Sequence, residues 1–364
     1  MARLHTPLCD RLGIRVPIVQ APMAGGPSTP ELVAAVSQSG ALGSFGFAYT
    51  QPETMQREVE TVRARTHLPF NLNLFASPPP GAIDPEAQRG AVAAVSGYCT
   101  ELGLPHPEPV RPPFAPELEA QLAMAEELRP PVLTFHLGTM SAHRVRHFQA
   151  LGVRIGGGAT CVAEAERLEA LGVDFIVAQG AEAGGHRGTY LRDPYDSMTG
   201  TLALVRLIVC RVATPVIAAG GIMDGAGIAA VLALGAQAAQ LGTAFIASPE
   251  SGAPRIHKER VLAAREDETL VTEKFSGKPA RGIANRFMRE MRERNAPQLP
   301  FPAQSALTAR LRTASAKSDN PDFVAMWAGQ AVALSRALPA AELVAALEAE
   351  TLEALDRLAA LRGR

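Results

Sequence analysis

The stretch AQGAEAGGHRGTY, residues 178–190, decides the fold and the kind of site in this 364-residue chain. It holds four glycines, one glutamine, one glutamate and one histidine, directly after the apolar run DFIV. A short apolar run bounded by glycine predicts a buried strand. A flexible, polar continuation is costly inside a packed core but suits a strand end that faces a ligand. Its interpretation depends on the elements on either side of it.

Short apolar runs alternate along the chain with segments that have apolar residues at helical spacing. The helical segments often begin with Ser, Thr or Asp, which are favourable N-caps. The strands are apolar on both faces, as in a parallel sheet covered on both sides. Eight strands in this alternation predict a (β/α)8 TIM barrel, with a doubly wound open sheet as the alternative. The predicted strands are residues 16–21, 41–46, 69–75, 131–137, 153–158, 174–179, 215–220 and 238–246.

Two segments of the chain are additional to the strands and helices of a minimal TIM barrel. Residues 76–115 are rich in proline and too long for a simple turn, so they form a lid, surface decoration or an oligomer interface. Residues 248–345 follow the eighth strand and contain the only tryptophan. We expect residues 1–247, together with a C-terminal helix at about 346–364, to form the barrel. Residues 248–345 are expected to form an inserted, mainly helical region on the substrate side, or a lid.

Composition excludes several classes of partner. A formal net charge of −1 argues against nucleic acid or an acidic membrane. No run reaches the ~18 apolar residues of a membrane span, and the N-terminus MARLHTPLCDRLG lacks the apolar core of a signal peptide. We therefore expect a cytoplasmic protein that acts on small molecules, with a homodimer as one assembly it could form.

Several common catalytic motifs are absent from the sequence. The four cysteines are scattered without a CxxC pair, so neither a disulfide nor a metal site is expected. There is no GxGxxG followed by a ribose-binding acid, no Walker motif, no GxSxG elbow and no HExxH. These absences remove the commonest NTPase, hydrolase and zinc-protease interpretations.

The ends of the seventh and eighth predicted strands are rich in glycine. A TIM barrel carries its active site at the carboxyl ends of its strands and commonly binds phosphate after strands seven and eight. The stretches AGGI, 219–222, and QLGT, 240–243, occupy these two places. Glycines such as Gly221 and Gly242 let backbone N–H groups approach a phosphate, and a following helix N-terminus adds a favourable dipole. The alternative is that the glycines only ease the turns.

Other strand ends place polar side chains at the same mouth. Asn71 and Asn73 share one face of their strand by alternation, so at least one is expected to face the mouth. An amide there suits a flavin ring, although a buried Asn or His can also be a satisfied core group. The remaining candidates at strand ends are Gln20, Met23, His136, Gln179 and His186.

Taken together, seven motifs resemble the nitronate monooxygenase family, formerly called 2-nitropropane dioxygenases, in its class I form. They are QAPMAGG, PFNLNLF, TFHLG, AQGAEAGGHRGTY, AAGGIMDGAG, AQLGTAF and DFVAMWAGQ. The resemblance implies a TIM barrel that binds FMN non-covalently and oxidises alkyl nitronates with O2 to a carbonyl compound and nitrite, without a nicotinamide. It implies His186 as the active-site histidine with His136 beside it. The implied FMN contacts are Met23, Asn73, Gln179, Gly184, Gly221, Gln240, Leu241, Gly242 and Thr243.

The chemistry of a histidine suits either of two roles at residue 186. Protonated, His186 could hold a nitronate anion; neutral, it could take the α-proton of a nitroalkane. Of its neighbours, Glu182 is expected to fix the loop, and Arg187 is expected to be exposed.

The resemblance leaves alternatives. Flavin-dependent enoyl-acyl-carrier-protein reductases share the AQGxEAGGHxG element but take hydride from NAD(P)H. A histidine at position 136 and the segment DFVAMWAGQ favour the monooxygenase. A non-catalytic barrel that only binds a ligand is the alternative outside the enzymes.

One stretch departs from the family's usual pattern. The family usually has Tyr-Pro, a second tyrosine and a lysine, where this chain has LPFPAQSALTAR with Phe301 and Pro302. We expect a more apolar pocket, with Arg310 as the residue that could restore charge. Propionate 3-nitronate is therefore in doubt as the best substrate, and a longer or uncharged one is an alternative.

Overall fold

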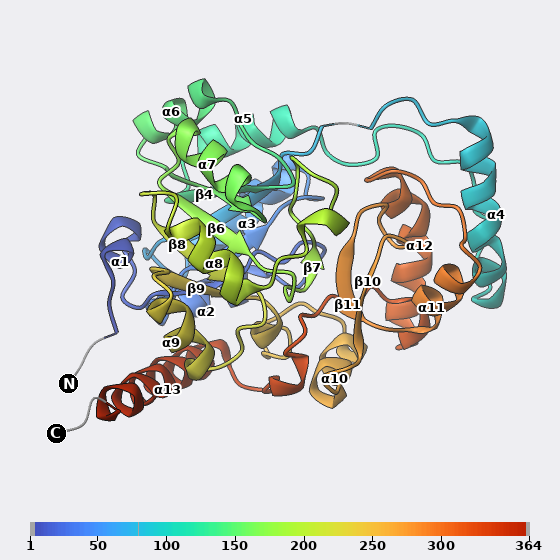
Figure 1. Cartoon of the computed structure of the whole chain (residues 1–364). Helices are drawn as coiled ribbons and strands as arrows, with labels where there is room; N and C mark the ends of the chain where they lie inside the picture. Colours follow the sequence, from blue (N-terminus) through green and yellow to red (C-terminus); the bar gives the residue numbers. More distant parts are fainter. Residues whose placement is uncertain (1–3, 79, 362–364) are drawn as a thin grey trace.

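Eight parallel strands form a closed barrel in the computed structural model, which describes residues 4–78 and 80–361 (Figure 1). The strand order is β1-β9-β8-β6-β5-β4-β3-β2. The barrel closes where the N–H of Leu42 donates to Ile18 and the N–H of Gln20 donates to Leu42. All eight predicted strands are confirmed, and the fold is a TIM barrel. The strands are β1 (Ile18–Gln20), β2 (Gly43–Gly46), β3 (Phe70–Phe75), β4 (Val132–His136), β5 (Arg154–Ala159), β6 (Phe175–Gln179), β8 (Val216–Ala219) and β9 (Ala238–Leu241).

A ring of helices covers the outside of the barrel. Side-chain N-caps start several of them: Thr29, Ser141 and Asp224 each accept the N–H three residues further on. No helix in residues 4–78 and 80–361 has the length and apolar character to cross a membrane. The covering helices are α2 (Pro30–Gln38), α3 (Pro52–Arg63), α5 (Leu118–Leu128), α6 (Ala142–Ala150), α7 (Val162–Leu171), α8 (Thr201–Val209), α9 (Gly225–Ala233) and α13 (Ala340–Ala360).

A short helix, α1 (Pro7–Leu12), closes the amino-terminal end of the barrel. Its residues Leu8 and Leu12 join a buried cluster with barrel residues such as Val132 and Phe175. A Cβ on Gly156 of β5 would lie 2.3 Å from the ring of Phe175, so glycine leaves room for that ring. With this end filled by side chains, a ligand site is left to the carboxyl ends of the strands.

A second lobe lies over the carboxyl ends of the strands (Figure 1). It contains α4 (Pro85–Glu101), from the Pro-rich excursion, and α11 (Arg286–Glu293) and α12 (Ala303–Lys317), from the expected helical region. These helices share one apolar core, in which the ring centroids of Phe275 and Phe287 are 4.6 Å apart. The remaining helices of the chain are α10 (Arg255–Ala263) and the 3-10 turns η1 (Tyr195–Ser197), η2 (Thr243–Phe245), η3 (Pro321–Phe323) and η4 (Val332–Leu334).

The lobe also contains a small antiparallel sheet that the sequence did not indicate. Strands β10 (Thr269–Thr272) and β11 (Ala280–Ile283) pair with each other. A third strand, β7 (Gly185–His186), comes from the glycine-rich stretch after β6 and pairs with β11, where His186 faces Ala280. The exit of the sixth barrel strand is therefore held by the second lobe.

Candidate active site

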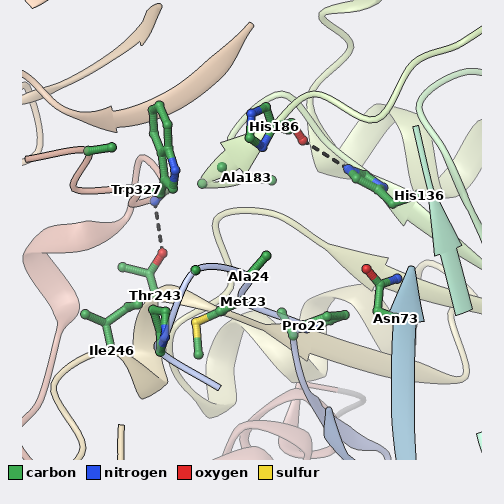
Figure 2. A pocket seen from close by; sticks show the side chains of 18 of the residues that line it. Pro22, Met23, Ala24, Asn73, His136, Ala183, His186, Thr243, Ile246 and Trp327 are labelled. Atoms are coloured by element: carbon green, nitrogen blue, oxygen red, sulfur yellow. Dashed lines mark hydrogen bonds between the residues drawn. The ribbon is translucent and has the colours of Figure 1, made fainter. Parts of the chain in front are cut away.

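A cavity of about 600 Å³ lies between the carboxyl ends of the strands and the second lobe. This volume is in the usual range for small-molecule sites. Figure 2 shows His186 and Ala183 facing Pro22, Met23 and Asn73 across it. Among the FMN contacts and histidines that the family resemblance implies, Leu241 is the one whose side chain does not line the cavity, because it packs in the main core. Gln20, a candidate from the strand ends, does not line it either: it is fully buried, and its Oε1 accepts the N–H of Ser44 at 2.8 Å. The predicted residues that do line it are Met23, Asn73, His136, Gln179, Gly184, His186, Gly221, Gln240, Gly242 and Thr243.

The imidazole of His186 is held by a hydroxyl and by aromatic rings. Its Nε2 lies 2.9 Å from Oγ of Ser276. The ring centroids of Phe75, Phe301 and Trp327 lie 5.8, 5.6 and 5.7 Å from that of His186. Phe75 comes from β3, whereas the other two come from the second lobe. Both halves of the molecule therefore fix the orientation of this histidine.

The environment of His186 favours the neutral imidazole. Burial lowers its pKa to about 3, and His136 in its protonated form and the positive charges of Lys278 and Arg312 lower it in the same direction. The ring keeps some accessible surface because it lines the cavity, but it lies deep enough for desolvation to dominate. A neutral imidazole at neutral pH can accept a proton, as a general base must.

His136 contacts the backbone of His186. Its Nε2 donates a hydrogen bond to the carbonyl oxygen of His186 at 3.2 Å, and burial lowers the pKa of His136 to about 4. The ring lies between two glycines: a Cβ on Gly188 would be 2.2 Å from its Cε1, and one on Gly158 would be 2.9 Å from its Nδ1. These glycines leave the space that the imidazole occupies.

The side-chain amide of Gln179 clamps the loop that carries His186. Its Nε2 donates to the carbonyl oxygen of His186 at 2.9 Å, and its Oε1 accepts the N–H of Gly188 at 2.8 Å. Arg187, expected to be exposed, is 5% exposed and donates to the carbonyl oxygens of Gln179, Thr160 and Ser197. The expectation was wrong: the carbonyls bond both terminal nitrogens of the buried guanidinium, and its Nε has no partner among the described residues.

Two buried or half-buried carboxylates hold the two ends of the same loop. Glu182 accepts the N–H of Thr201 at 2.8 Å and also the hydroxyl of that residue, so it fixes the loop as expected. Glu164, which is fully buried, accepts hydrogen bonds from Thr160, Thr189 and the N–H of Tyr190. With both ends tied, the glycine-rich stretch is a fixed part of the cavity wall.

The glycine-rich ends of β8 and β9 lie side by side in the wall of the cavity. The N–H groups of Gly221, Ile222 and Gly242 have no hydrogen-bond partner within residues 4–78 and 80–361. Gly221 has φ 71°, a left-handed conformation that favours glycine. Oγ1 of Thr243 accepts the N–H of Gly329 at 2.9 Å, which leaves the hydroxyl proton free to donate (Figure 2). These unpartnered donors could hold an anion, and we call them the anion-binding cradle.

The helix N-terminus after β8 does not serve this cradle, contrary to the sequence expectation. The N–H of Gly227 in α9 is bonded to the side chain of Asp224 at 2.8 Å, and that of Gly225 to Glu350 at 3.0 Å. Two carboxylates therefore occupy the helix end.

The two asparagines of β3 belong to one hydrogen-bond chain. Asn73 donates to Oγ1 of Thr134 at 2.9 Å, and Thr134 donates to Oδ1 of Asn71 at 3.1 Å. Asn73 lines the cavity, whereas Asn71 is 1% exposed and lies beneath it. One asparagine faces the mouth, as expected, and the other fixes its orientation.

A cation from α12 lines the cavity, but it is not the predicted one. Arg310 is exposed, so the expectation that it restores charge was wrong. Arg312 lines the cavity instead, donating to the carbonyl oxygen of Ser305 at 2.8 Å and to Thr308 at 3.2 Å. No carboxylate of the described residues lies within 4.0 Å of it. Burial lowers the pKa of Arg312, and the nearby Tyr49 hydroxyl, also in the cavity wall, opposes this.

Comparison with known proteins gives concordant matches across the chain. A family model described as nitronate monooxygenase matches residues 6–350. A nitronate monooxygenase from Pseudomonas aeruginosa is 44% identical over 342 residues, which cover 93% of this chain and 97% of the relative. The solved structure of nitroalkane oxidase from Streptomyces ansochromogenes is 39% identical with a TM-score of 0.90 and covers 97% of this chain and 100% of that one. The structure of FabK from Thermotoga maritima is 28% identical with a TM-score of 0.76 and covers 98% and 99%.

Proposed function

Since the chain belongs to the nitronate monooxygenase family and is thus an oxidoreductase, we propose that it binds FMN and oxidises alkyl nitronates with O2 to a carbonyl compound and nitrite. The observation that carries this proposal is that a neutral histidine, His186, lies in the same cavity as backbone N–H groups without a hydrogen-bond partner among the described residues. These are the N–H groups of Gly221, Ile222 and Gly242. A base and an anion cradle in one cavity suit a nitro compound and a phosphorylated cofactor.

The residues present fit a flavin mononucleotide. The unpartnered N–H groups and the free hydroxyl proton of Thr243 suit a phosphate, which needs several donors. Asn73 keeps its amide oxygen and one N–H for the polar edge of a ring. A Cβ on Gly185 would meet no heavy atom within 4 Å, so the backbone there borders open space. When bound, the flavin supplies a two-electron acceptor that reacts with O2.

The protein's own contribution to the reaction is proton transfer and orientation. His186, neutral at pH 7, takes the α-proton of a neutral nitroalkane, and the resulting nitronate stays in the cavity. His136 and Gln179 hold the carbonyl oxygen of His186, so we assign them positioning roles. A substrate that arrives as a nitronate does not need the base, and Arg312 supplies positive charge for its binding.

Absorbance and product analysis test this function. We expect a yellow protein whose cofactor, released by acid and separated by chromatography, is FMN. With an alkyl nitronate in air, it should consume O2 and release nitrite. A colourless protein that does not take up FMN on titration would contradict the proposal and favour a barrel that only binds a ligand.

The reductase alternative is separated by an anaerobic experiment. The protein is mixed with NADH or NADPH and, separately, with an alkyl nitronate while the flavin absorbance is followed. Bleaching by the nitronate and not by the nicotinamides supports the proposed function. Rapid bleaching by a nicotinamide, with no response to nitronate, would assign an enoyl-acyl-carrier-protein reductase-like activity. The higher identity and TM-score of the nitroalkane oxidase structure support the first outcome.

A further inference from the structure

Ser276 lies where it can decide which nitrogen of His186 carries the proton. It belongs to the turn between β10 and β11, is 3% exposed, and its N–H is bonded to the carbonyl oxygen of Glu273 at 3.2 Å. Its Oγ lies 2.9 Å from Nε2 of His186 and 3.1 Å from the carbonyl oxygen of Lys278. The N–H of Lys278 approaches the same oxygen at 3.4 Å.

Counting protons at Ser276 gives one consistent arrangement. A serine hydroxyl has one proton to donate and two lone pairs to accept with. The carbonyl oxygen of Lys278 can only accept, and it has no other donor among the residues that the structure describes. If Ser276 donated to His186 instead, two oxygen lone pairs would face each other at 3.1 Å and the carbonyl would lack a partner, which is unfavourable. Ser276 therefore donates to Lys278, and Nε2–H of His186 donates to Ser276.

We propose that Ser276 is a positioning residue that holds His186 in the tautomer with the proton on Nε2, so that Nδ1 is the base. This inference rests on the proposed role of His186. Nδ1 has no partner among the described residues, and the ring lines the cavity. In the step itself, the α-carbon–hydrogen bond of a nitroalkane breaks and the proton bonds to Nδ1. The electron pair stays on the substrate and delocalises into the nitro group, giving the nitronate. The imidazolium keeps its Nε2–H bond to Ser276.

The arrangement around Ser276 is built by the fold of the lobe. Gly277 has φ 84°, and a Cβ there would lie 2.4 Å from the carbonyl oxygen of Leu299, so only glycine fits this turn without displacement. The turn places Ser276 beside β7, whose His186 faces Ala280 of β11. The hydroxyl and the imidazole are thus fixed by the same small sheet.

Nitrogen NMR tests the tautomer without any turnover. The protein is labelled with ¹⁵N-histidine, and the signals of His186 are identified as those missing from His186→Asn. At pH 7 we expect Nε2 of His186 to resonate as a protonated nitrogen and Nδ1 as an unprotonated one. In Ser276→Ala the pattern should change to a mixture or to the opposite tautomer, and Ser276→Thr, which keeps the hydroxyl, should retain it. A proton on Nδ1 in the wild type, or an unchanged pattern in Ser276→Ala, would overturn the proposal.

Kinetics of the holoenzyme separate this inference from the proposed function. Ser276→Ala should slow the turnover of neutral nitroalkanes on the order of 10- to 100-fold, less than the ~10²–10⁴ that a general base contributes. Turnover of preformed nitronates should change much less, and Ser276→Thr should recover the loss. Equal losses on both substrates would overturn the positioning role. If the NMR tautomer is as expected but His186→Asn still turns over nitroalkanes, the base role of His186 fails and the tautomer stands.

Discussion

His136 donates its hydrogen bond to the backbone carbonyl oxygen of His186 and not to the imidazole. The two histidines that the sequence predicts as a catalytic pair therefore have unequal parts. The imidazole of His186 is bonded to the hydroxyl of Ser276, whereas that of His136 is bonded to the backbone of the loop that carries His186. Substitutions at these residues should have different kinetic signatures.

Replacing His186 should slow the turnover of neutral nitroalkanes more than the turnover of preformed nitronates. In His186→Asn, turnover of neutral nitroalkanes should fall ~10²-fold or more, because the imidazole that accepts the α-proton is removed. Activity on preformed nitronates should survive better. Steady-state nitrite release from both substrate forms measures this difference. Equal loss on both forms would point to an anion-binding role for His186.

Replacing His136 should disturb geometry and leave the base in place. In His136→Phe, kcat for neutral nitroalkanes should fall on the order of 10-fold, the value of one lost hydrogen bond to the loop. The pH dependence that belongs to His186 should keep its shape. A loss as large as that in His186→Asn would show that His136 itself transfers a proton.

Gly221→Ala should weaken FMN binding on the order of 10-fold, about 1.4 kcal/mol, which corresponds to one lost hydrogen bond to a charged group. A side chain at φ 71° is strained, and its Cβ would lie 3.1 Å from Cβ of Glu182, so the loop must shift. Fluorescence titration of the apoprotein with FMN gives the affinity. Gly172→Ala is the matched control, because Gly172 has φ 80° at the end of α7 with no heavy atom within 4 Å of a Cβ. It should lower stability and leave FMN affinity unchanged, and an equal loss of affinity in both variants would contradict the cradle.

Arg312→Met should raise KM for a nitronate on the order of 10-fold, because one charge-assisted contact to the anion is lost. KM for a neutral nitroalkane should change little. Stability should change little, since the half-buried guanidinium has no carboxylate partner to lose. Arg310→Met, two residues away on the exposed side of α12, is the control and should leave both KM values unchanged. Equal effects on both substrate forms would assign Arg312 to the fold.

Acid should destabilise the protein through its buried histidines. Burial lowers the pKa of His136, His186 and His257 to about 4, 3 and 4, below the ordinary 6.5. Below pH 6.5 the unfolded chain therefore binds more protons than the folded one, and stability falls with falling pH until the folded pKa is reached. Each site contributes about 1.4 kcal/mol per pH unit in this window. Urea unfolding at pH 7, 6 and 5 should show the loss.

His257 offers a test of one of these sites. Its Nε2 donates to the carbonyl oxygen of Trp327 at 3.2 Å, and the residue is 4% exposed. His257→Gln keeps a donor without a titrating group, so its stability should fall less steeply between pH 6.5 and 4. An identical slope in the variant would remove His257 from the acid response.

The pattern of apolar residues along the chain predicted most of the barrel. The features that it did not predict depend on contacts between residues far apart in the sequence. Each strand is an apolar run that can be identified by itself, and residues such as Asn73 and Gln179 end up in the cavity because they stand at strand ends. Ser276 is bonded to a histidine 90 residues earlier, and Glu350 caps a glycine 125 residues away. The hydrophobic periodicity of the sequence does not indicate such pairs.

The same limit explains the errors in charge placement. Arg310 and Arg312 are both on α12, and only the packing of that helix on the barrel decides which one faces the cavity. Arg187 is buried with three carbonyl oxygens bonded to its terminal nitrogens, and a sequence does not show where carbonyls point. Burial of polar groups depends on the partners that the tertiary fold supplies.

Because β7 pairs with β11, the proposed cofactor site and the surroundings of His186 depend on different parts of the molecule. Almost every residue proposed to hold the cofactor belongs to the barrel, whereas the hydroxyl and two of the three rings around His186 belong to the lobe. Partial unfolding of the lobe would therefore abolish catalytic activity before the cofactor was released. A damaged or incompletely folded molecule could stay yellow and inert, and colour alone would overstate the active fraction of a preparation.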